Sequence, residues 1–323
     1  MQADTLSEVL QAVRLRGAVF FDVDARAPWV AETPPAQVIA PAVMPRSEHV
    51  IEYHVITRGG CWAQIAGEGE PVRLEAGDVV AFPQGDAHIL SSEPGMRGKV
   101  DLGEFEVLKG MQLPLAMNLN GDGATTQIVC GFLGCDARPF NPLLQSLPRL
   151  LHVRPSPDSK APTEAFMQFA LLETREQRVG AAGMLSRLGE LMFGELVRRH
   201  VEAMPEDGRG WLAGLRDRHV GKALAVLHAD PRRDWTLESL AREAGLSRSA
   251  FATRFSGYIG MAPMQYLTRW RLQLAASQLS ETDTGIAMIA ERAGYESEAA
   301  FSRAFRRAVG MPPAAWRGRN QSR

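Results

Sequence analysis

The feature that most constrains this 323-residue chain is a repeat near its carboxyl end. Segments 237–263 and 286–313 share small and aromatic residues at matching places. The shared positions are Ala241, Ala244, Gly245, Ser247, Phe251, Phe255, Gly260, Met261 and Pro263, matched by Ala290, Ala293, Gly294, Ser297, Phe301, Phe305, Gly310, Met311 and Pro313. The offset is 49 residues for the first three pairs and 50 for the others, so the second copy has one extra residue in its turn. Repetition of this quality predicts two copies of one structural unit.

Each copy has the pattern of a helix-turn-helix. Small alanines on the first helix let a second helix pack close across it. Gly245 and Gly294 are expected to take the left-handed conformation that ends the first helix, and a serine then caps the second. Phenylalanines four residues apart lie on one face of the second helix and pack into the core. We predict helix-turn-helix units at about 237–256 and 286–307, joined by a long amphipathic helix.

The opposite face of each second helix is free to enter a DNA major groove. The residues we place on that face are Arg248, Ser249, Ala252 and Thr253 in the first unit, and Glu298, Ala299, Ser302 and Arg303 in the second. Arginine reads guanine edges, serine serves several bases, and glutamate accepts from cytosine. Arg306 and Arg307 lie further along and are expected to contact phosphates. The alternative, that these helix pairs serve only core packing, is far weaker for two matched copies than for one.

The charge distribution supports a polyanionic partner for the carboxyl end. From residue 218 onward there are 16 Lys and Arg against 9 Asp and Glu, a net charge of +7. The rest of the chain holds 20 and 28, a net charge of −8, so the whole chain carries −1. An acidic body with a basic terminal region is typical of proteins whose terminal region binds nucleic acid.

The amino-terminal half has the pattern of short strands. Between Val38 and about Val107, and again in TTQIVCGFLGC, β-rich runs alternate with Gly, Pro and Asp. The earlier runs are IEYHVITRGGCWAQIAG, PVRLEAGDVVAFPQGDAHILSS and GKVDLGEFEVL. With no long helical pattern between them, they predict a β-barrel or β-sandwich.

Helical spacing begins at Asn141. PLLQSLPRLLHV predicts a short helix, and the apolar residues from Thr163 to Val201 predict two longer ones with a break around 178–183. These helices are expected to form a dimer interface, brace the two domains, or cover one face of the barrel. We therefore predict an α+β chain with a barrel at 1–150, a helical linker at 151–209 and an all-α DNA-binding domain at 210–323.

The repeat region closely resembles the DNA-binding domain of the AraC/XylS family of transcription regulators. The pattern A-x-x-x-G-φ-S, F-x-x-x-F, G-x-x-P is present in both copies apart from the extra turn residue, and Arg271, Leu272 and Ala275 supply the central R-φ-x-x-A. The match covers roughly 218–317, and Trp316 stands where the family usually has tyrosine. The resemblance implies a double-stranded DNA operator, RNA polymerase as a partner, and a homodimer.

The amino-terminal part resembles the cupin (jelly-roll) barrel that precedes such domains as an effector-sensing module. Four residues fit the second cupin motif, G-x5-P-x-G-x2-H: Gly77, Pro83, Gly85 and His88. Ser92 replaces the motif's terminal Asn. In the first motif Glu52 stands correctly before Gly59, but Arg46 and Glu48 replace its paired histidines.

Two kinds of chemistry in the barrel stay open. Glu52 and His54 lie two apart on one face of a strand and could converge with His88 and Cys130 on a divalent metal, although no cofactor is required. Otherwise these groups hydrogen-bond within the barrel. Cys61, Cys130 and Cys135 could sense oxidants or be small buried residues. They include no CxxC pair and predict neither a disulfide framework nor a four-cysteine zinc site. Trp62, Phe82 and Phe105 could line an effector pocket or fill the core.

The leading hypothesis is a sequence-specific transcriptional activator or repressor, not an enzyme, controlled by a small molecule, metal or oxidant sensed in the barrel. The rival is a metal-dependent cupin enzyme with an accessory helical domain. A barrel that serves only for dimerisation is a third possibility. No apolar run approaches the roughly 20 residues that span a bilayer, and the chain starts without a signal-peptide pattern, so we expect a cytoplasmic protein with no membrane partner.

Overall fold

The structure, a computed structural model, describes residues 4–45, 47–100, 103, 115–154, 162–176, 178–205 and 207–321. The chain divides into two units. The sheet unit contains Leu15–Cys135 and Leu147–Glu202, and the helical unit contains Met1–Arg14, Asp136–Ser146 and Ala203–Arg323. The chain therefore passes from one unit to the other four times. No helix of the described residues is long and apolar enough to cross a membrane.

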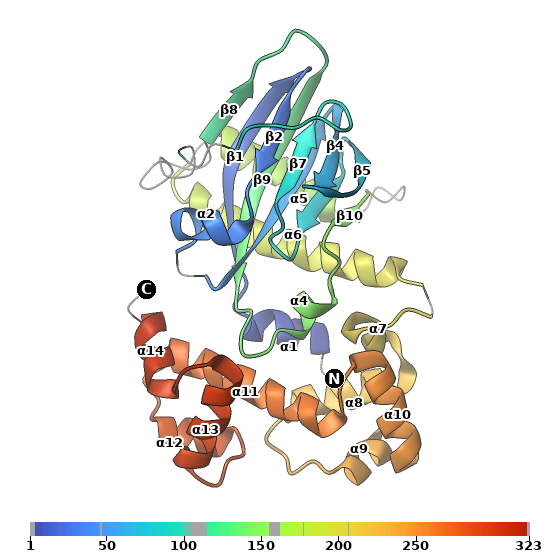
Figure 1. Cartoon of the computed structure of the whole chain (residues 1–323), viewed down its shortest axis with the longest axis vertical. Helices are drawn as coiled ribbons and strands as arrows, with labels where there is room; N and C mark the ends of the chain where they lie inside the picture. The colour runs from blue at the N-terminus through green and yellow to red at the C-terminus, as the bar shows by residue number, and fades with distance from the viewer. Residues whose placement is uncertain are drawn as a thin grey trace. The chain divides into compact units, whose positions relative to one another are not determined.

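The described residues of the sheet unit form ten strands in two sheets, which Figure 1 shows. The six-stranded sheet has the order β10 (Leu151–Val153), β6 (Val79–Phe82), β3 (His49–Arg58), β9 (Thr125–Cys135), β1 (Arg16–Arg26) and β8 (Leu115–Leu119). The four-stranded sheet has the order β2 (Val30–Thr33), β7 (His88–Ser91), β4 (Gly60–Ile65) and β5 (Glu68–Glu75). Neighbouring strands are antiparallel except β1 and β8. The predicted cupin-type β architecture is confirmed.

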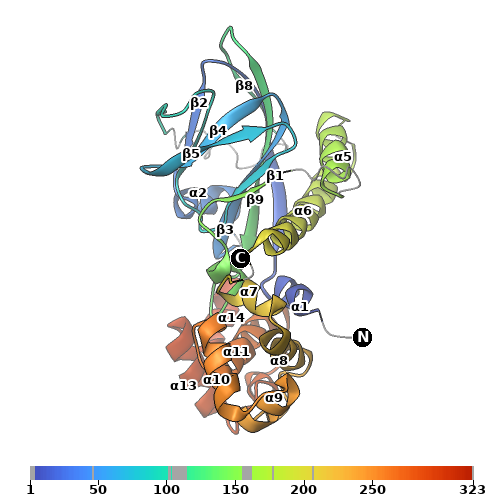
Figure 2. The same ribbon diagram turned by 90° about the vertical axis from the view of Figure 1, so that its right-hand side faces the viewer.

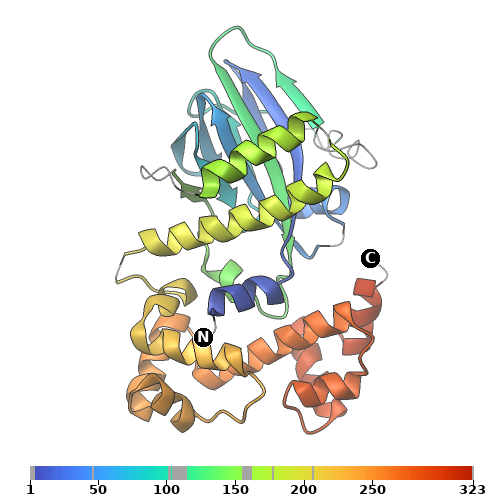
Figure 3. The same ribbon diagram turned by 180° about the vertical axis from the view of Figure 1, so that it is seen from behind.

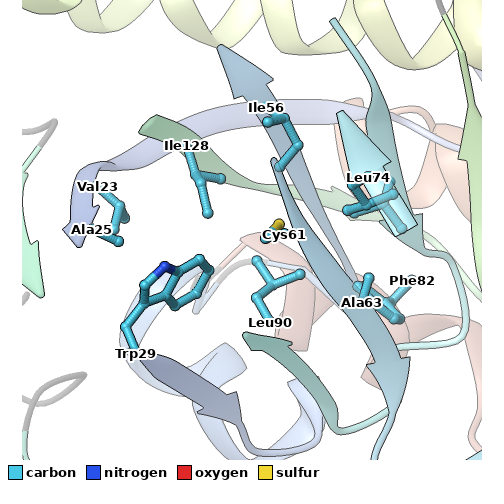
Figure 4. Packing of buried hydrophobic residues seen from close by; sticks show 11 residues of the cluster. Val23, Ala25, Trp29, Ile56, Cys61, Ala63, Leu74, Phe82, Leu90 and Ile128 are labelled. Atoms are coloured by element: carbon cyan, nitrogen blue, oxygen red, sulfur yellow. The ribbon is translucent and has the colours of Figure 1, made fainter. Parts of the chain in front are cut away.

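The core of the sheet unit lies between the two sheets, and both contribute to it (Figure 4). Val23, Ile56 and Ile128 come from the larger sheet, whereas Cys61 and Leu90 come from the smaller one. Successive side chains of a strand point to opposite faces. Ile56 faces this core, so the residues two and four positions before it on β3 face the same interior.

Helices α5 (Pro162–Glu176) and α6 (Ala181–Ala203) lie across the outer face of the larger sheet (Figures 2 and 3). At Gly17 a Cβ atom would overlap the Ser186 carbonyl oxygen, and the Gly17 N–H donates to Glu190 at 3.2 Å. On β3, a Cβ added at Gly189 of α6 would lie 3.0 Å from the Tyr53 hydroxyl, so α6 also covers the outer face of β3, which is buried on both faces. The predicted helical pair at 163–201 thus belongs to the sheet unit, and α2 (Ala36–Val43) adds a further helix there.

The helical unit contains the repeat (Figure 1). Its helices are α7 (Trp211–Arg216), α8 (Arg218–Ala229), α9 (Leu237–Ala244), α10 (Arg248–Ile259), α11 (Pro263–Glu281), α12 (Ile286–Arg292), α13 (Glu298–Val309) and α14 (Pro313–Gln321). The long helix α11 contacts α10 on one side and α12, α13 and α14 on the other. Its buried side chains recur at helical spacing, while Gln265, Thr268 and Arg269 are exposed, so this amphipathic connecting helix is also the shared core of both halves.

The predicted turn chemistry is confirmed in both copies. Gly245 and Gly294 have φ of 71° and 79°, the left-handed region that favours glycine. The hydroxyls of Ser247 and Ser297 accept from the backbone N–H three residues on, as helix caps do. The four repeated phenylalanines are all fully buried.

Two further segments pack within the helical unit. The expected DNA-binding domain at 210–323 did not include them. Helix α1 (Thr5–Ala12) contacts α8 and α11, and the short helix α4 (Pro142–Ser146) contacts α7. The Arg14 guanidinium donates two hydrogen bonds to Asp136, at 2.6 and 2.7 Å. The buried Gln273 side chain on α11 accepts from the Phe140 N–H at 3.1 Å and donates to the Ala12 carbonyl at 3.2 Å.

The local structure differs from the expectations in two places, and a third expectation lies outside the described residues. PLLQSLPRLLHV is a helix only over α4, since its last residues pair with β6 as β10. Strand β1 was not predicted, because the pattern from Arg16 does not alternate cleanly between apolar and polar residues. Most of the run GKVDLGEFEVL lies outside the described residues.

Replacing Gln273 with leucine is expected to destabilise the helical unit by about 2–4 kcal/mol, because two buried backbone groups would lose their partner. Urea unfolding followed by circular dichroism measures this. The control is Gln265→Leu, an exposed position on the same helix, which should change stability little. Equal effects of the two substitutions would contradict the bridging role.

Candidate DNA interface and barrel pocket

The face predicted to read DNA is open to solvent on both second helices. On α10, Arg248, Ser249 and Thr253 are exposed and Ala252 is half-buried. The α13 residues of that face are exposed, apart from a half-buried serine: Glu298, Ala299, Ser302, Arg303, Arg306 and Arg307. The buried phenylalanines hold the opposite face of each helix, so the exposed face and its amino-terminal turn are left for a ligand.

Contacts to the other helices fix each second helix in place. On α10 the Arg254 guanidinium binds Asp217, whose carboxylate also caps α8 by accepting from the backbone of His219 and Val220. These donors outweigh partial burial and lower the pKa of Asp217 to about 2. Near α13, Trp316 is fully buried and its Nε1–H donates to the Ala276 carbonyl at 3.2 Å. The tryptophan therefore serves as the aromatic anchor expected at that position.

Sequence reasoning did not single out Arg254 or Glu238. Arg254 looked like one more basic residue of the recognition helix, and only the three-dimensional structure pairs it with Asp217, 37 positions earlier. Glu238 lies 3.0 Å from Arg248, and both are exposed. Arg248 therefore has an acidic partner in the protein itself before it meets a base or phosphate.

In the barrel, three predicted polar residues meet in the interior. Glu52 and His54 lie on β3, two residues apart and on the same face as Ile56, and His88 begins β7 of the other sheet. All three are almost completely buried. His54 Nε2 lies 2.8 Å from His88 Nε2, and His88 Nε2 lies 3.9 Å from a Glu52 carboxylate oxygen.

The hydrogen bonds of the two histidines assign their protons. His88 Nδ1 lies 3.0 Å from the carbonyl oxygen of Asp86, which only accepts, so Nδ1 carries the proton. His88 Nε2 then accepts from the Nε2–H of His54, which leaves His54 Nδ1 as a bare acceptor. Burial lowers the pKa of His88 to about 4 and also lowers that of His54, so both rings are neutral near pH 7.

The carboxyl group of Glu52 is buried without a hydrogen-bond partner on either oxygen, and His54 Nδ1 has none either. Desolvation raises the pKa of Glu52 well above its ordinary value of 4.5. The interior of the barrel thus holds a carboxyl group that favours its neutral form beside an imidazole acceptor.

These residues do not fit a metal centre. Two nitrogens that share a Zn²⁺ at about 2.0–2.1 Å in a tetrahedral site stay roughly 3.3 Å apart, whereas His54 and His88 bond directly to each other at 2.8 Å. Among the described residues, no group of three or more His, Cys, Asp or Glu side chains is placed to hold a metal ion. Arg46, which stands where the first cupin motif has a histidine, lies outside the described residues.

The second cupin motif has a structural role in this chain. Gly85 has a φ of 69°, and a Cβ there would crowd Ala36 and the Val50 carbonyl. Ser92, which replaces the motif's Asn, exchanges hydrogen bonds with Trp29. Its hydroxyl accepts from the Trp29 N–H at 3.0 Å, and its own N–H donates to the Trp29 carbonyl at 3.0 Å.

The cysteines have the environment of unreactive thiols. Cys61 and Cys135 are buried, and no disulfide joins the three. Burial raises the pKa of Cys61 to about 12 and that of Cys130 still further. Because the thiolate is the reactive form, this environment disfavours oxidation.

A pocket of about 160 Å³ opens beside the buried polar residues. It is lined by Phe21, Val23, Trp29, Val30, Ala31, Glu32, Thr33, Glu52, His54, Leu90, Lys99, Met117, Leu119, Ile128, Cys130, Gly131 and Phe132. Of the aromatic residues considered for a pocket or for the core, Trp62 and Phe82 do not line this pocket. Phe82 is in the core and stacks on His88, Trp62 packs under Arg73, and Phe105 lies outside the described residues.

Replacing Glu52 with glutamine is expected to stabilise the protein above pH 5, and the gain should grow toward pH 8. The native state keeps the carboxyl proton that the unfolded chain releases above its ordinary pKa of 4.5, so rising pH favours unfolding until the native pKa is reached. Thermal unfolding at several pH values tests this. Glu75→Gln, an exposed control on β5, should show no such trend. A pH-independent difference would mean that Glu52 is ionised in the fold.

Comparisons with known proteins agree with this architecture. A cupin family model matches residues 4–202, and a helix-turn-helix domain model matches residues 240–319. An AraC-like transcription regulator of Streptomyces lividans is 33% identical over 97% of this chain and 98% of its own length. The HTH-type transcriptional regulator AlkR of Acinetobacter baylyi is 28% identical over 97% of this chain and 99% of its own.

Among solved structures, the DNA-binding domain of the global transcriptional factor AdpA, in complex with a target DNA, is 30% identical. The match covers 33% of this chain and 96% of the AdpA domain, with a TM-score of 0.32. The near full-length relatives and the two domain matches show the family. The chain belongs to the AraC-like transcription regulators, with an amino-terminal cupin domain and a carboxyl-terminal helix-turn-helix domain that binds DNA.

Proposed function

We propose that this regulator reads a bipartite operator with α10 and α13, which enter successive major grooves roughly 34 Å apart. The observation that carries the proposal is the pair of matched helices, each buried through its phenylalanines and open on the face that carries Arg248 or Arg303. Ser249, Ala252, Thr253, Glu298, Ala299 and Ser302 complete the base-reading surface. Arg306 and Arg307, in the last turn of α13, bind phosphates.

The barrel supplies the control. A small-molecule effector binds in the pocket beside Glu52 and changes how the DNA-binding domain is presented, which requires unequal affinity for two conformations. The buried, unpartnered polar atoms of that pocket support this role. The family resemblance implies two partners. RNA polymerase is the partner that converts operator binding into activation, and a second copy of the chain completes a homodimer on the DNA. Such a regulator works in the cytoplasm, where chromosomal DNA is.

The rival function, a metal-dependent cupin enzyme, has little support. The relatives that match nearly the whole chain are named as transcription regulators. Of the four residues considered as metal ligands (Glu52, His54, His88 and Cys130), the two histidines bond to each other. We therefore propose that the barrel is a sensing domain that needs no metal cofactor and is not a catalytic one. Oxidant sensing is disfavoured by the raised pKa values of Cys61 and Cys130 and by the burial of Cys135.

Selection of random duplexes by the full chain, followed by sequencing, is the experiment that tests operator reading. The full chain is needed because α1 and α4 pack within the helical unit and a fragment starting near residue 210 would lack them. An enriched site with two short elements about one helical turn apart is the expected result. Weak binding without enrichment would contradict sequence-specific reading.

Arg303→Ala is expected to relax sequence preference and cost about 1–3 kcal/mol at one or two base positions. Arg307→Ala is expected to weaken binding to all sequences alike and to reduce the salt slope by about one unit. Both are measured by titrating the variants with selected and scrambled duplexes at two salt concentrations.

The matched control for these titrations is Arg187→Ala, which removes one exposed arginine from α6 in the sheet unit. It should leave both the affinity and the salt slope close to those of the parent protein. If the Arg303 and Arg307 variants behaved alike, the division into a base reader and a phosphate contact would be wrong.

A further inference from the structure

The pocket of the sheet unit combines apolar walls with a small polar end. Trp29, Leu90, Met117 and Ile128 belong to the walls, and Glu52 and His54 form the polar end. Glu52 and His54 come from one face of β3, so both point to the interior between the sheets. A polar end inside an apolar cavity is the usual composition of a small-molecule site.

The polar atoms at that end need a partner that the protein does not provide. Both oxygens of the Glu52 carboxyl and the Nδ1 of His54 are buried without a hydrogen bond, although buried polar atoms are nearly always paired. In its neutral form the carboxyl donates one hydrogen bond and accepts others, whereas His54 Nδ1 only accepts. A hydroxyl group satisfies both at once, since it accepts from Glu52 and donates to His54.

Charged groups fit this end poorly. A carboxylate could accept from the neutral Glu52 carboxyl and from the unpartnered Nε1–H of Trp29. It would, however, leave His54 Nδ1 without a donor and lose its hydration between apolar walls, and Lys99 at the pocket is exposed to solvent. An ammonium group would pair with an ionised Glu52, but both ions would lose their hydration in a site with few further hydrogen-bond partners. The pocket chemistry therefore favours a neutral polar group.

The volume limits the size of the ligand. A cavity of about 150 Å³ in another protein holds one benzene molecule, and this pocket has about 160 Å³. A single ring with one small substituent fills that space, so the part of a ligand that lies inside the pocket is of about this size.

We propose that this pocket binds a neutral, largely apolar molecule of single-ring size whose one hydroxyl group bonds to Glu52 and His54. The inference rests on the proposed control of the regulator by a ligand in the barrel, and it names the chemical class of that ligand. Trp29, which lines the pocket and is held through its backbone by Ser92, packs against the ring.

Calorimetric titration of the full chain with four probes tests the class. Phenol carries the hydroxyl, toluene replaces it with a methyl group of similar size, and benzoate and benzylammonium replace it with an anion and a cation. Phenol should bind with one molecule per chain, and toluene at least ~10-fold more weakly, because the buried polar pair is left unsatisfied. Equal binding of toluene, tighter binding of either ion, or no heat with any probe would overturn the proposal.

Variants of the pocket locate the binding. Glu52→Leu should weaken phenol binding ~10-fold or more without weakening toluene, whereas Glu52→Gln, whose amide both donates and accepts, should change it less than about threefold. Met117→Trp fills part of the space and should abolish binding of every probe. Glu75→Gln is the exposed control. Phenol binding that survives Met117→Trp would place the ligand elsewhere and refute the assignment.

Operator binding measured on the same variants separates this inference from the proposed function. If Glu52→Leu loses phenol but still selects the operator, DNA reading stands independently of the pocket. If phenol binds as expected but does not change operator affinity, the ligand class holds and control through the barrel fails. Circular dichroism of each variant confirms that the fold is retained.

Discussion

The phenylalanine pairs at the centre of the two helix-turn-helix units are the contacts on which the DNA-binding function depends. Phe251 and Phe255 turn one face of α10 into the core, and Phe301 and Phe305 do the same for α13. Residues spaced four apart lie on the same face of a helix, so this face is the one that packs into the core. Everything on the other face, including Arg248 and Arg303, is thereby left for the ligand.

In the cupin domain, by contrast, the polar residues of interest are buried. Helix α6 covers the outer face of β3, and the smaller sheet covers its inner face, where Glu52 and His54 point, so these polar residues have no solvent. Glu52 and His54 are held there at a cost in desolvation. Well-packed apolar residues would avoid this cost, and the burial of the two polar residues beside a cavity supports the ligand site that we propose.

The two units are linked by the chain in a way that bears on control. Strands β1 and β9, which pair over most of their length, both line the pocket. Each continues directly in sequence into a segment that packs within the helical unit: β1 from α1, and β9 into the segment that begins at Asp136. Arg14 and Asp136 tie these two segments together, and Gln273 bonds to both. The strands that would contact an effector are thus covalently continuous with the DNA-binding unit.

The sequence by itself determined the helix-turn-helix units, their caps and their buried faces, because these depend on contacts between residues close in the chain. The strand TTQIVCGFLGC coincides with β9 for the same local reason. The sequence also indicated that Glu52, His54 and His88 would meet, since β3 and a cupin motif place them on facing strands.

Only the tertiary structure decided what those groups can do. The direct bond between His54 and His88 is set by how the two sheets approach, and of the two alternatives left open it corresponds to hydrogen bonding within the barrel. The pocket is lined by Trp29 and Met117 and not by Trp62 or Phe82, because the side to which a strand residue points depends on which sheet face is covered. The placement of α1 and α4 in the helical unit likewise rests on Gln273, whose partners lie more than a hundred residues away. Such long-range pairings leave no periodic signal in a single sequence.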